Sequence, residues 1–490
     1  MSLLQRIEAK VALAHQAVTR NVAVTAIQEY QLTTAIPRSS FRAYDIRGIA
    51  DTELTPDSVY TIARAIATFF RQNTVTEVVI ARDDRLSSPV LYPALKAGLL
   101  DTGLDVIELG RVPTPMLYFA THVSATSSGI MLTASHNAAQ YNGLKIVFRQ
   151  HPLTPEQIQQ IYDLAVANDF VAGQGNASEL AITERYLEHV ARNVNVNKPL
   201  KVVVDCGNAI TSEIAPQLLQ RLGCEVVPLH CVSDGRFPNH HPDPTIVENL
   251  QDLIGAVHEH QTDIGLALDG DGDRLGVVTE TGEIIWPDRQ LMLFARDILP
   301  KHLGATVIYD VKCSRHLATV IEEQQGKPLM WKTGHSLIEN KMVETDAVLA
   351  GEMSGHLFFR DRWFGCDDGL YTAARLLEVL SRFAGGASEL FAQLPNSFNT
   401  PELKLEVCDE DKFRLMDDIT QQAEFVDATV TTIDGLRVEY PDGWGLIRPS
   451  NTTPCLVLRF EADDETALKH IQAAFREQLL KVDDSLSLPF

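Results

Sequence analysis

Three stretches of the 490-residue sequence repeat one pattern, in which an apolar run ends at an aspartate and is followed by a helical stretch and a second apolar run. The three aspartates are Asp83, Asp205 and Asp310. A helix between two short strands is the crossover that joins parallel neighbours in a sheet. The repeats lie much further apart than the ~20–50 residues of solenoid units. The pattern therefore predicts three related α/β domains.

The two ends of the chain depart from this pattern. After about Thr400 the runs KLEVCDED, LRVEY, GWGLIRPS and CLVLRFEA read as strands joined by tight turns, and residues 465–482 read as a closing helix, which predicts a smaller α+β domain. Before Ser39, apolar residues recur at helical spacing from Leu4 to Val18 and predict an amphipathic helix. We therefore divide the chain into an N-terminal extension (1–38), which we expect to be helical, three α/β domains (39–180, 181–283 and 284–397) and an α+β domain (398–490).

The composition limits the classes of partner and compartment. A formal net charge of −23 would repel nucleic acid and an anionic membrane surface, so we expect neither as a partner. It would also repel a phosphorylated substrate, unless basic residues or a metal gather at the site. The seven cysteines show no C-x-x-C spacing, which argues against a disulfide framework. No signal peptide or apolar run of bilayer length is apparent, so we expect a soluble, cytoplasmic protein.

The stretch GIMLTASHNAAQYNGLKIVF combines a strand, a polar loop and a second strand. The first apolar run stops at Ser135, and Asn142-Gly143 marks a turn before the second. Reactive groups of open α/β sheets gather at the carboxyl ends of strands, where Ser135 would lie. A serine hydroxyl needs a base or a metal to act as a nucleophile, and His136 and Lys145 lie close in sequence. The string alone fits a turn serine equally well.

A second loop, DGDGDR, follows the apolar run IGLAL and carries Asp269, Asp271 and Asp273. Three carboxylates from one tight loop suit a hard divalent cation. An EF-hand begins with the same pattern, but it needs glycine where this chain has Arg274, and it needs flanking helices where this chain has strand-like runs. Carboxylates at this spacing repel one another unless a cation lies among them. The loop therefore predicts a metal site.

Two further polar loops occur in the second half of the chain. Glu352, Ser354 and His356 lie on a glycine-bracketed loop, and such side chains can hold sugar hydroxyls or exchange protons, although loops of this composition are common. Arg448 precedes four small polar residues (450–453), and a guanidinium with hydroxyl and backbone donors is typical of a phosphate site. A hydrated turn is the alternative for the second loop.

Two histidine-containing strings have weaker interpretations. His240 and His241 are adjacent in FPNHHPDP, and because neighbouring residues rarely chelate one ion together, we interpret them as part of a structural loop. Lys332 and His335 follow the third repeat in WKTGHSL, where a catalytic and a loop-forming role both fit.

Taken together, the strings FRAYDIRG, TASHN, DGDGDR, GEMSGH and RPSNTTP resemble, in this order, motifs of the α-D-phosphohexomutase superfamily, and most closely those of bacterial phosphomannomutase/phosphoglucomutase. The resemblance covers about Ser39 to the C-terminus. It implies three similar mixed-sheet α/β domains and a TATA-box-binding-protein-like α+β domain around a central cleft. The last loop reads S-N-T-T, where phosphoglucosamine mutases more typically carry S-G-T-E, and this favours the mannose and glucose branch.

The resemblance also implies a role for each motif. Ser135 would be the phosphoserine, and a phosphoryl oxygen on it would bind Mg²⁺ together with Asp269, Asp271 and Asp273. The transfer site would be lined by Tyr44, Arg47, His136, Lys145 and Arg274. The sugar would be held by Glu352 and Ser354, with Lys312, His335 and His356 nearby, and its non-reacting phosphate by Arg448, Ser450, Asn451 and Thr452. Proton transfer would fall to His356, Lys145 or Arg47.

The implied activity is reversible transfer of a phosphoryl group between positions 1 and 6 of mannose and glucose, through a phosphoserine enzyme and a hexose 1,6-bisphosphate. We expect Mg²⁺ as cofactor, glucose 1,6-bisphosphate as activator, phosphosugars as the binding partners, and a monomer. The alternatives are a phosphoglucosamine mutase, a sugar phosphatase, and a non-catalytic protein that binds calcium or sugar phosphates.

Overall fold

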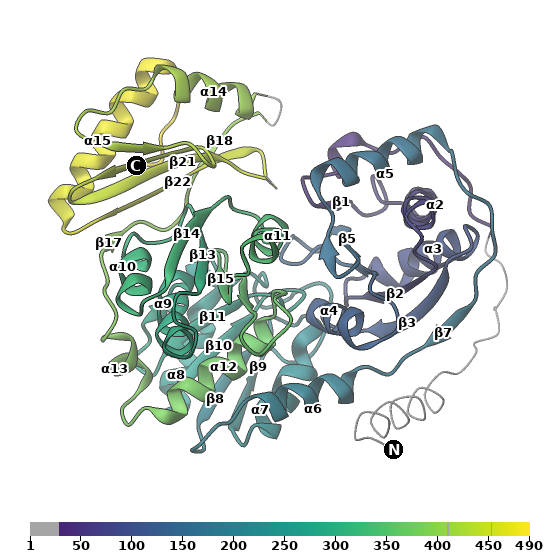
Figure 1. The fold of residues 1–490 in the computed structure, drawn as a ribbon, viewed down its shortest axis with the longest axis horizontal. Helices are drawn as coiled ribbons and strands as arrows, with labels where there is room; N and C mark the ends of the chain where they lie inside the picture. The colour runs from purple at the N-terminus through teal and green to yellow at the C-terminus, as the bar shows by residue number, and fades with distance from the viewer. Residues whose placement is uncertain (1–28, 409–410, 452) are drawn as a thin grey trace. The chain divides into compact units, whose positions relative to one another are not determined.

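A computed structural model of the chain describes residues 29–408, 411–451 and 453–490 (Figure 1). The chain divides into two compact units. Of the described residues, the first unit contains those up to Ile284 together with Cys366–Ala387, and the second contains those of Ile285–Gly365 and Ser388–Phe490. Among the described helices, none combines the length and apolar character that crossing a membrane would require.

The first sheet of unit 1 is mixed, with parallel pairing in its middle and antiparallel pairing at one side. In spatial order its strands are β1 (Asp45–Ile49), β5 (Tyr141–Phe148), β4 (Gly129–Leu132), β2 (Glu77–Arg82), β3 (Asp105–Arg111) and β7 (Ala177–Glu179), and β6 (His151–Pro152) pairs with β5. The helices are η1 (Arg38–Ser40), α2 (Pro56–Gln72), α3 (Ser88–Leu100), α4 (Thr114–Val123), α5 (Pro155–Ala167) and α6 (Thr183–Asn193).

Alternating residues of β2 separate the two faces of this sheet. Ile80 belongs to the apolar core that includes Ile66 of α2, Leu95 of α3 and Ile158 of α5, and Figure 1 shows these three helices grouped together. The opposite face is covered by α4, which contacts β2 and β4. Both faces are buried, so the strand is apolar from Val78 to Ala81, as a central parallel strand requires.

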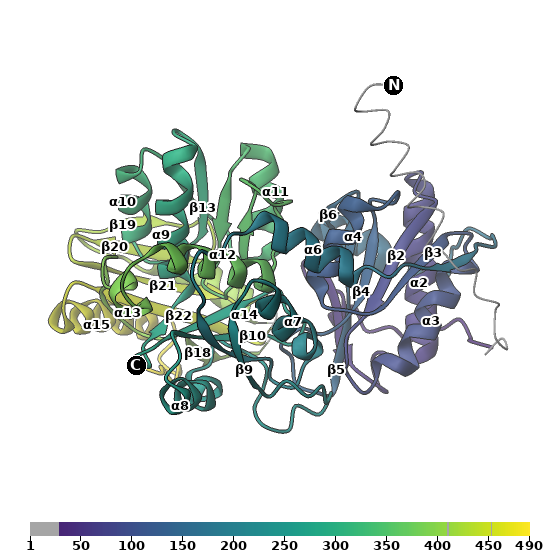
Figure 2. The same ribbon diagram turned by 90° about the horizontal axis from the view of Figure 1, so that it is seen from below.

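The second sheet of unit 1 repeats this arrangement in a smaller form. Its strands, in spatial order, are β12 (Ile284–Ile285), β11 (Leu275–Thr279), β10 (Ile264–Leu268), β8 (Lys201–Asp205) and β9 (Glu225–Leu229). Its helices are η2 (Ile210–Ser212), α7 (Ile214–Arg221), η3 (Val247–Leu250), α8 (Gln251–His260) and α12 (Gly369–Arg382). Figure 2 shows α7, α8 and α12 with β9 and β10.

Unit 2 contains two further sheets. The first, mixed, has the strands β14 (Lys327–Trp331), β13 (Thr306–Asp310), β15 (Leu349–Gly351) and β16 (Leu357–Phe359), with helices α9 (Pro287–Ile298), η4 (Leu299–Lys301), α10 (His316–Glu323), α11 (His335–Thr345) and α13 (Ala387–Phe391). The second, antiparallel, has β17 (Phe398–Asn399), β22 (Cys455–Ala462), β21 (Gly443–Pro449), β20 (Leu436–Tyr440) and β19 (Thr429–Thr431), with β18 (Leu403–Glu406) also paired to β22. Its helices are α14 (Lys412–Gln422) and α15 (Glu465–Val482).

The antiparallel sheet uses its two faces differently. One face packs on α14 and α15, through residues such as Ile419 and Phe475. From the other face, Trp444 packs on Val311, just beyond β13, and the guanidinium of Arg437 lies 3.9 Å from the centre of the Trp444 ring. Arg437 also donates to the carbonyls of Val311 and Cys313 at 2.6 and 2.9 Å. The last two sheets therefore belong to one packed unit.

The three predicted repeats are confirmed as strand–helix–strand units with parallel strands. Their aspartates share one task, because each carboxylate accepts a hydrogen bond from the backbone N–H two residues further on. The acceptor–donor pairs are Asp83 with Arg85 at 3.1 Å, Asp205 with Gly207 at 2.9 Å and Asp310 with Lys312 at 3.1 Å. The carboxylate closes the turn that leaves the strand, as aspartate commonly does.

The strands and the last helix predicted after Thr400 are confirmed, whereas α14 was not predicted from the sequence. The amphipathic helix expected over Leu4 to Val18 lies outside the described residues. Residues 29–37 of the same predicted extension are not helical, which corrects that part of the prediction. They run along α2 instead, where Tyr30 stacks on Tyr60 and the Gln31 N–H donates to Asp57 at 3.0 Å.

Candidate active site

Ser135 lies three residues beyond β4, on a loop with an unusual backbone conformation. Its φ is 48°, in the left-handed region that costs a non-glycine residue roughly 1–2 kcal/mol. The Ser135 N–H donates to the Thr133 hydroxyl at 3.0 Å. A Cβ on Gly270 would lie only 2.1 Å from the Ser135 carbonyl oxygen, so a glycine is needed for this approach. The serine loop and the acidic loop are thus packed backbone to backbone.

Arg85 binds the backbone of the serine loop, a role that the sequence did not suggest. It is buried, and its guanidinium donates to the carbonyls of four residues between the end of β4 and the start of β5, at 2.6–3.0 Å. These residues are Ser135, Asn137, Ala138 and Tyr141. Asp83, the strand-end aspartate of the first repeat, lies 3.2 Å from the Arg85 Nε and balances its charge. A fork of donors on one rigid side chain suits the binding of several carbonyls at once.

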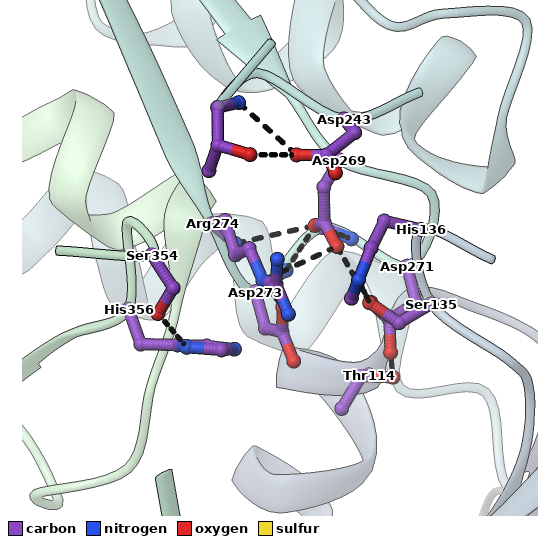
Figure 3. A network of polar contacts seen from close by, with 12 residues as sticks. Thr114, Ser135, His136, Asp243, Asp269, Asp271, Asp273, Arg274, Ser354 and His356 are labelled. Carbon is purple, nitrogen blue, oxygen red and sulfur yellow. Dashed lines mark hydrogen bonds and ion pairs between the residues drawn. The ribbon is translucent and has the colours of Figure 1, made fainter. Parts of the chain in front are cut away.

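The Ser135 hydroxyl points into the acidic loop (Figure 3). Its Oγ donates to Asp269 Oδ2 at 2.7 Å and lies 3.2 Å from Nδ1 of His136. The other oxygen of Asp269 accepts from the backbone N–H groups of Gly272, Asp273 and Arg274 at 3.0–3.2 Å. Backbone donors thus hold one oxygen of this carboxylate, while the other faces the serine.

The other two carboxylates of the loop are held by Thr114 and Lys145, and Figure 3 labels Thr114 and Asp271. The Thr114 hydroxyl donates to Asp271 Oδ2 at 2.6 Å, and Nζ of Lys145 lies 2.7 Å from the same oxygen. Lys145 also forms an ion pair with Asp273. Thr114, at the start of α4, is a second residue that sequence reasoning missed.

The pairing of β1 with β5 brings two predicted basic residues to this place. Asp45 is opposite Lys145 and Arg47 is opposite Gly143 in the register of the two strands. The Arg47 guanidinium bonds to Asp45 and to the Asn137 side chain, both at 2.5 Å. A Cβ at Gly143 would meet the Ile46 carbonyl at 2.4 Å, which explains the glycine in the Asn142-Gly143 turn. Strands far apart in sequence therefore deliver Arg47 and Lys145 to the serine loop.

Burial and neighbouring charges raise the pKa values of Asp269 and Lys145 and lower that of His136. Burial, together with the carboxylates of Asp273 and Asp271, raises the pKa of Asp269 well above its ordinary value. Burial alone would lower the pKa of Lys145, but Asp271 and Asp273 outweigh it and raise that pKa. Burial and the positive charges of Arg274 and Arg47 lower the pKa of His136 well below its ordinary value, so this imidazole is neutral near pH 7.

The acidic loop fits a divalent cation with oxygen ligands. One oxygen from each of Asp269, Asp271 and Asp273 lies within 4.8 Å of the others, and all three residues are fully buried. Within the described residues, Asp271 Oδ1 is buried without a hydrogen-bond partner. A buried carboxylate oxygen without a donor is costly unless a cation binds it. The loop can therefore hold a metal beside the Ser135 hydroxyl.

The glycine-bracketed loop of unit 2 forms a separate polar cluster. Glu352 is buried and accepts from the Gly334 N–H at 2.5 Å, and its second oxygen lies 3.1 Å from Nδ1 of His356. The Ser354 hydroxyl lies 2.9 Å from the same nitrogen (Figure 3), and the His335 and His356 rings are 5.5 Å apart. Although burial alone would raise it, the contact with His356 lowers the pKa of Glu352.

The Arg448 loop lies next to this cluster within unit 2. Nε of Arg448 bonds to Asp434 at 2.9 Å, and the same aspartate accepts from the Thr333 N–H at 2.9 Å. The Asn451 amide donates to the Thr333 carbonyl at 3.0 Å. Thr333 precedes Gly334, so the two predicted loops meet through one short segment. This segment belongs to the WKTGHSL string, whose role the sequence left open.

The structure thus brings together two sets of predicted residues. Unit 1 gathers Arg47, Ser135, His136, Lys145, Asp269, Asp271, Asp273 and Arg274, and unit 2 gathers His335, Glu352, Ser354, His356, Arg448 and Asn451. The structure also places three other predicted residues, Ser450, Lys312 and Tyr44. Ser450 bonds to Thr453 in the Arg448 loop at 2.7 Å, Lys312 pairs with Glu402 at 2.6 Å, and Tyr44 is half-buried just before β1. Thr452 lies outside the described residues.

Comparison with known families covers most of the chain. Four models described as phosphoglucomutase/phosphomannomutase domains match in order: α/β/α domain I at residues 38–172, domain II at 184–282, domain III at 286–398 and the C-terminal domain at 402–478. The chain belongs to this family. The four matches also agree with the mixed α/β architecture of four sheets described above.

Relatives with high sequence identity span nearly the whole chain. A phosphomannomutase/phosphoglucomutase of Pseudomonas putida is 53% identical over 93% of this chain and 98% of its own length. A phosphoglucomutase of Neisseria meningitidis is 49% identical over 90% of this chain and 96% of its own. The crystal structure of a phosphoglucomutase/phosphomannomutase family protein from Burkholderia thailandensis matches with a TM-score of 0.89 and 49% identity, over 93% of this chain and all of that one.

Proposed function

We propose that this family member interconverts mannose 1-phosphate with mannose 6-phosphate, and glucose 1-phosphate with glucose 6-phosphate, through phosphorylated Ser135. The observation that carries the proposal is the 2.7 Å bond from the Ser135 hydroxyl to Asp269, inside a buried loop of three carboxylates. The high identity to a phosphomannomutase/phosphoglucomutase supports both sugars as substrates.

In the proposed reaction, phospho-Ser135 gives its phosphoryl group to the free hydroxyl of a hexose phosphate, and Ser135 regains a proton. The resulting hexose 1,6-bisphosphate turns in the site and its other phosphoryl group passes to Ser135, whose hydroxyl proton goes to the sugar oxygen that is released. Phosphoserine carries about −1.5 to −2 charges at neutral pH. Such transfers depend mainly on positioning and on neutralising charge. Lys145, Arg274 and Arg47 supply positive charge beside the serine.

We propose Mg²⁺ as the metal, held by Asp269, Asp271, Asp273 and a phosphoryl oxygen on Ser135. When bound, the ion would offset negative charge on the transferred group. The carboxylates are already positioned for the ion by the protein, since the Thr114 hydroxyl holds Asp271 and the Gly272 N–H holds Asp269. His136 is neutral near pH 7, so it contributes a hydrogen bond and no charge at Ser135.

For sugar and phosphate recognition we propose the two loops of unit 2. Glu352 and Ser354 would bind the 3- and 4-hydroxyls, and Arg448, Ser450, Asn451 and Thr452 the phosphate that does not react, with Lys312 and His335 nearby. The proximity of the first and second loops through Thr333 and Gly334 supports this assignment. His356, Lys145 and Arg47 are the candidates for moving the hydroxyl proton.

The proposal extends to glucose 1,6-bisphosphate as activator, to a cytoplasmic monomer, and to the domain limits near residues 38, 180, 283 and 397. The matched family models support these limits.

A coupled assay with mannose 1-phosphate, glucose 1-phosphate and glucosamine 1-phosphate tests the substrate choice, while release of inorganic phosphate is followed in parallel. A mutase forms the 6-phosphates of mannose and glucose without free phosphate. Phosphate release in step with substrate loss would identify a phosphatase, and preferred turnover of the glucosamine compound would identify the phosphoglucosamine branch.

A further inference from the structure

A second group of metal-ligand side chains lies in unit 1, at the carboxyl ends of β8 and β9. It consists of Asp205, His230 and His240, and the proposed reaction uses none of them. One carboxylate oxygen and one ring nitrogen of each histidine lie within 4.8 Å of one another. We propose that these three side chains bind a Zn²⁺ ion.

The hydrogen bonds of His240 point one ring nitrogen at Asp205. Its Nδ1 lies 2.9 Å from the carbonyl oxygen of His241, and because a carbonyl can only accept, the Nδ1 atom carries hydrogen. Nε2 lies 2.9 Å from Oδ2 of Asp205. Zinc-bound histidines commonly donate their other ring N–H to a carbonyl or a carboxylate in this way. Nε2 and Oδ2 are therefore placed to share one ion.

His230 brings the second imidazole and its own orienting carboxylate. Its Nε2 lies 3.0 Å from Oδ2 of Asp252 on α8, and its ring packs edge-to-face on His240 with centroids 5.2 Å apart. The histidine side chains are 15% and 14% exposed, so an ion can reach them from solvent. Asp205 is buried, and its other oxygen is held by the Gly207 N–H at 2.9 Å.

The chemistry of this set differs from that of the acidic loop. Two imidazoles and one carboxylate suit zinc, which takes nitrogen ligands readily and can complete its coordination with water. Mg²⁺ and Ca²⁺ prefer oxygen ligands and would favour Asp269, Asp271 and Asp273. The two sites should therefore be distinguishable by metal.

A metal ion at this site would restrict the long loop that follows β9. Residues 231–246 join β9 to η3 without a helix or strand, and they carry His240. Within this connection, the Pro242 carbonyl accepts from the Gly270 N–H of the acidic loop at 3.1 Å. An ion shared by Asp205, His230 and His240 would tie the connection to β8 and β9. Closing such a loop reduces the conformations open to it.

The test uses untagged full-length protein with Zn²⁺ at one equivalent and Mg²⁺ in large excess, to occupy the acidic loop. We expect the wild type to retain one zinc per chain after dialysis against Mg²⁺. His230→Gln and His240→Gln should each bind zinc at least ~10-fold more weakly, as should Asp252→Asn, where the side chain only orients a ligand. His260→Gln, at an exposed position of α8, is the matched control and should retain the ion.

Two further measurements keep the result independent of how the variants fold. X-ray absorption at the zinc edge of the wild type should show imidazole ligands, and hydrogen exchange of residues 231–246 should slow on adding zinc. Failure of the wild type to retain zinc, equal retention by the histidine variants, or an all-oxygen zinc environment would overturn the proposal. In those cases His240–Asp205 and His230–Asp252 are ion pairs only.

Discussion

The substitution Arg85→Lys tests whether the hydrogen bonds of Arg85 position the serine loop, as distinct from binding the substrate or taking part in the phosphoryl transfer. The substitution keeps a positive charge beside Asp83 but removes the fork that reaches four carbonyls. Each hydrogen bond from a charged donor contributes about 1.5–3 kcal/mol, and a lysine at this site can replace only part of the set. Ser135 holds a left-handed backbone conformation, so we expect the loop to relax when these bonds are lost.

A displacement of about 1 Å at a reacting group can cost 10²-fold in rate. We therefore expect kcat to fall by about that factor, while KM changes little because Arg85 is proposed to hold the loop and not the sugar. The assay is the rate at which glucose 1,6-bisphosphate phosphorylates Ser135, followed by mass spectrometry beside steady-state kinetics. Arg82→Lys is the matched control, since Arg82 ends the same strand and its guanidinium donates to the Asp83 carbonyl and not to the serine loop.

Wild-type labelling and turnover in Arg85→Lys would show that the four carbonyl bonds do not position Ser135. A rise in KM with unchanged kcat would place Arg85 in substrate binding instead. Either result would refute the reasoning.

Three other predictions concern the acidic loop, the buried His122 and the sugar-binding loop. Asp271→Asn should lower kcat by more than about 100-fold, beyond the usual effect of changes around a metal, and full activity of the wild type in excess chelator would contradict the metal site. Burial, with a contribution from His151, lowers the pKa of His122 to about 4, below its value in the unfolded chain. Neutral His122 therefore contributes its full stability above about pH 6.5, and this contribution is lost as the pH falls towards 4, because the unfolded chain takes up the proton first. Between about pH 6.5 and about pH 4 the wild type should lose up to roughly 3 kcal/mol more of its free energy of unfolding than His122→Phe does. Thermal melts of the variant with the same pH dependence as those of the wild type would contradict this. Galactose 1-phosphate, whose 4-hydroxyl points the other way, should have a kcat/KM at least ~10²-fold below that of glucose 1-phosphate, and comparable turnover would show that Glu352 and Ser354 do not read carbon 4.

Much of the fold could be predicted because its signals are local. The strand-end aspartates Asp83, Asp205 and Asp310 mark the same turn in three repeats, and the last helix coincides with its apolar periodicity. Helix α14 was not predicted because its apolar pattern is short: its buried side chains are those of Lys412, Met416 and Ile419.

Site residues could likewise be predicted where their signal is local, and could not where their partners are distant in the sequence. Ser135 and the three aspartates occur in compact strings, so their chemistry is legible in one stretch of sequence. Arg85 contacts a loop some fifty residues away and lies in a polar string that resembles an exposed turn. Its position two residues after Asp83, at the same sheet edge as Ser135, was the available signal. Likewise, the sequence places His240 beside His241, whereas the side chains that lie close to His240 in the structure are Asp205 and His230, from distant parts of the chain.

The central claim is that Ser135 carries the phosphoryl group between the two positions of the sugar. The most direct measurement is peptide mass spectrometry of protein incubated with glucose 1,6-bisphosphate and Mg²⁺, followed by a chase with mannose 1-phosphate. The account predicts one phosphate, on Ser135, that leaves as mannose 1,6-bisphosphate during the chase, and no labelling or turnover in Ser135→Ala. Phosphate on another residue, together with full activity of Ser135→Ala, would contradict it.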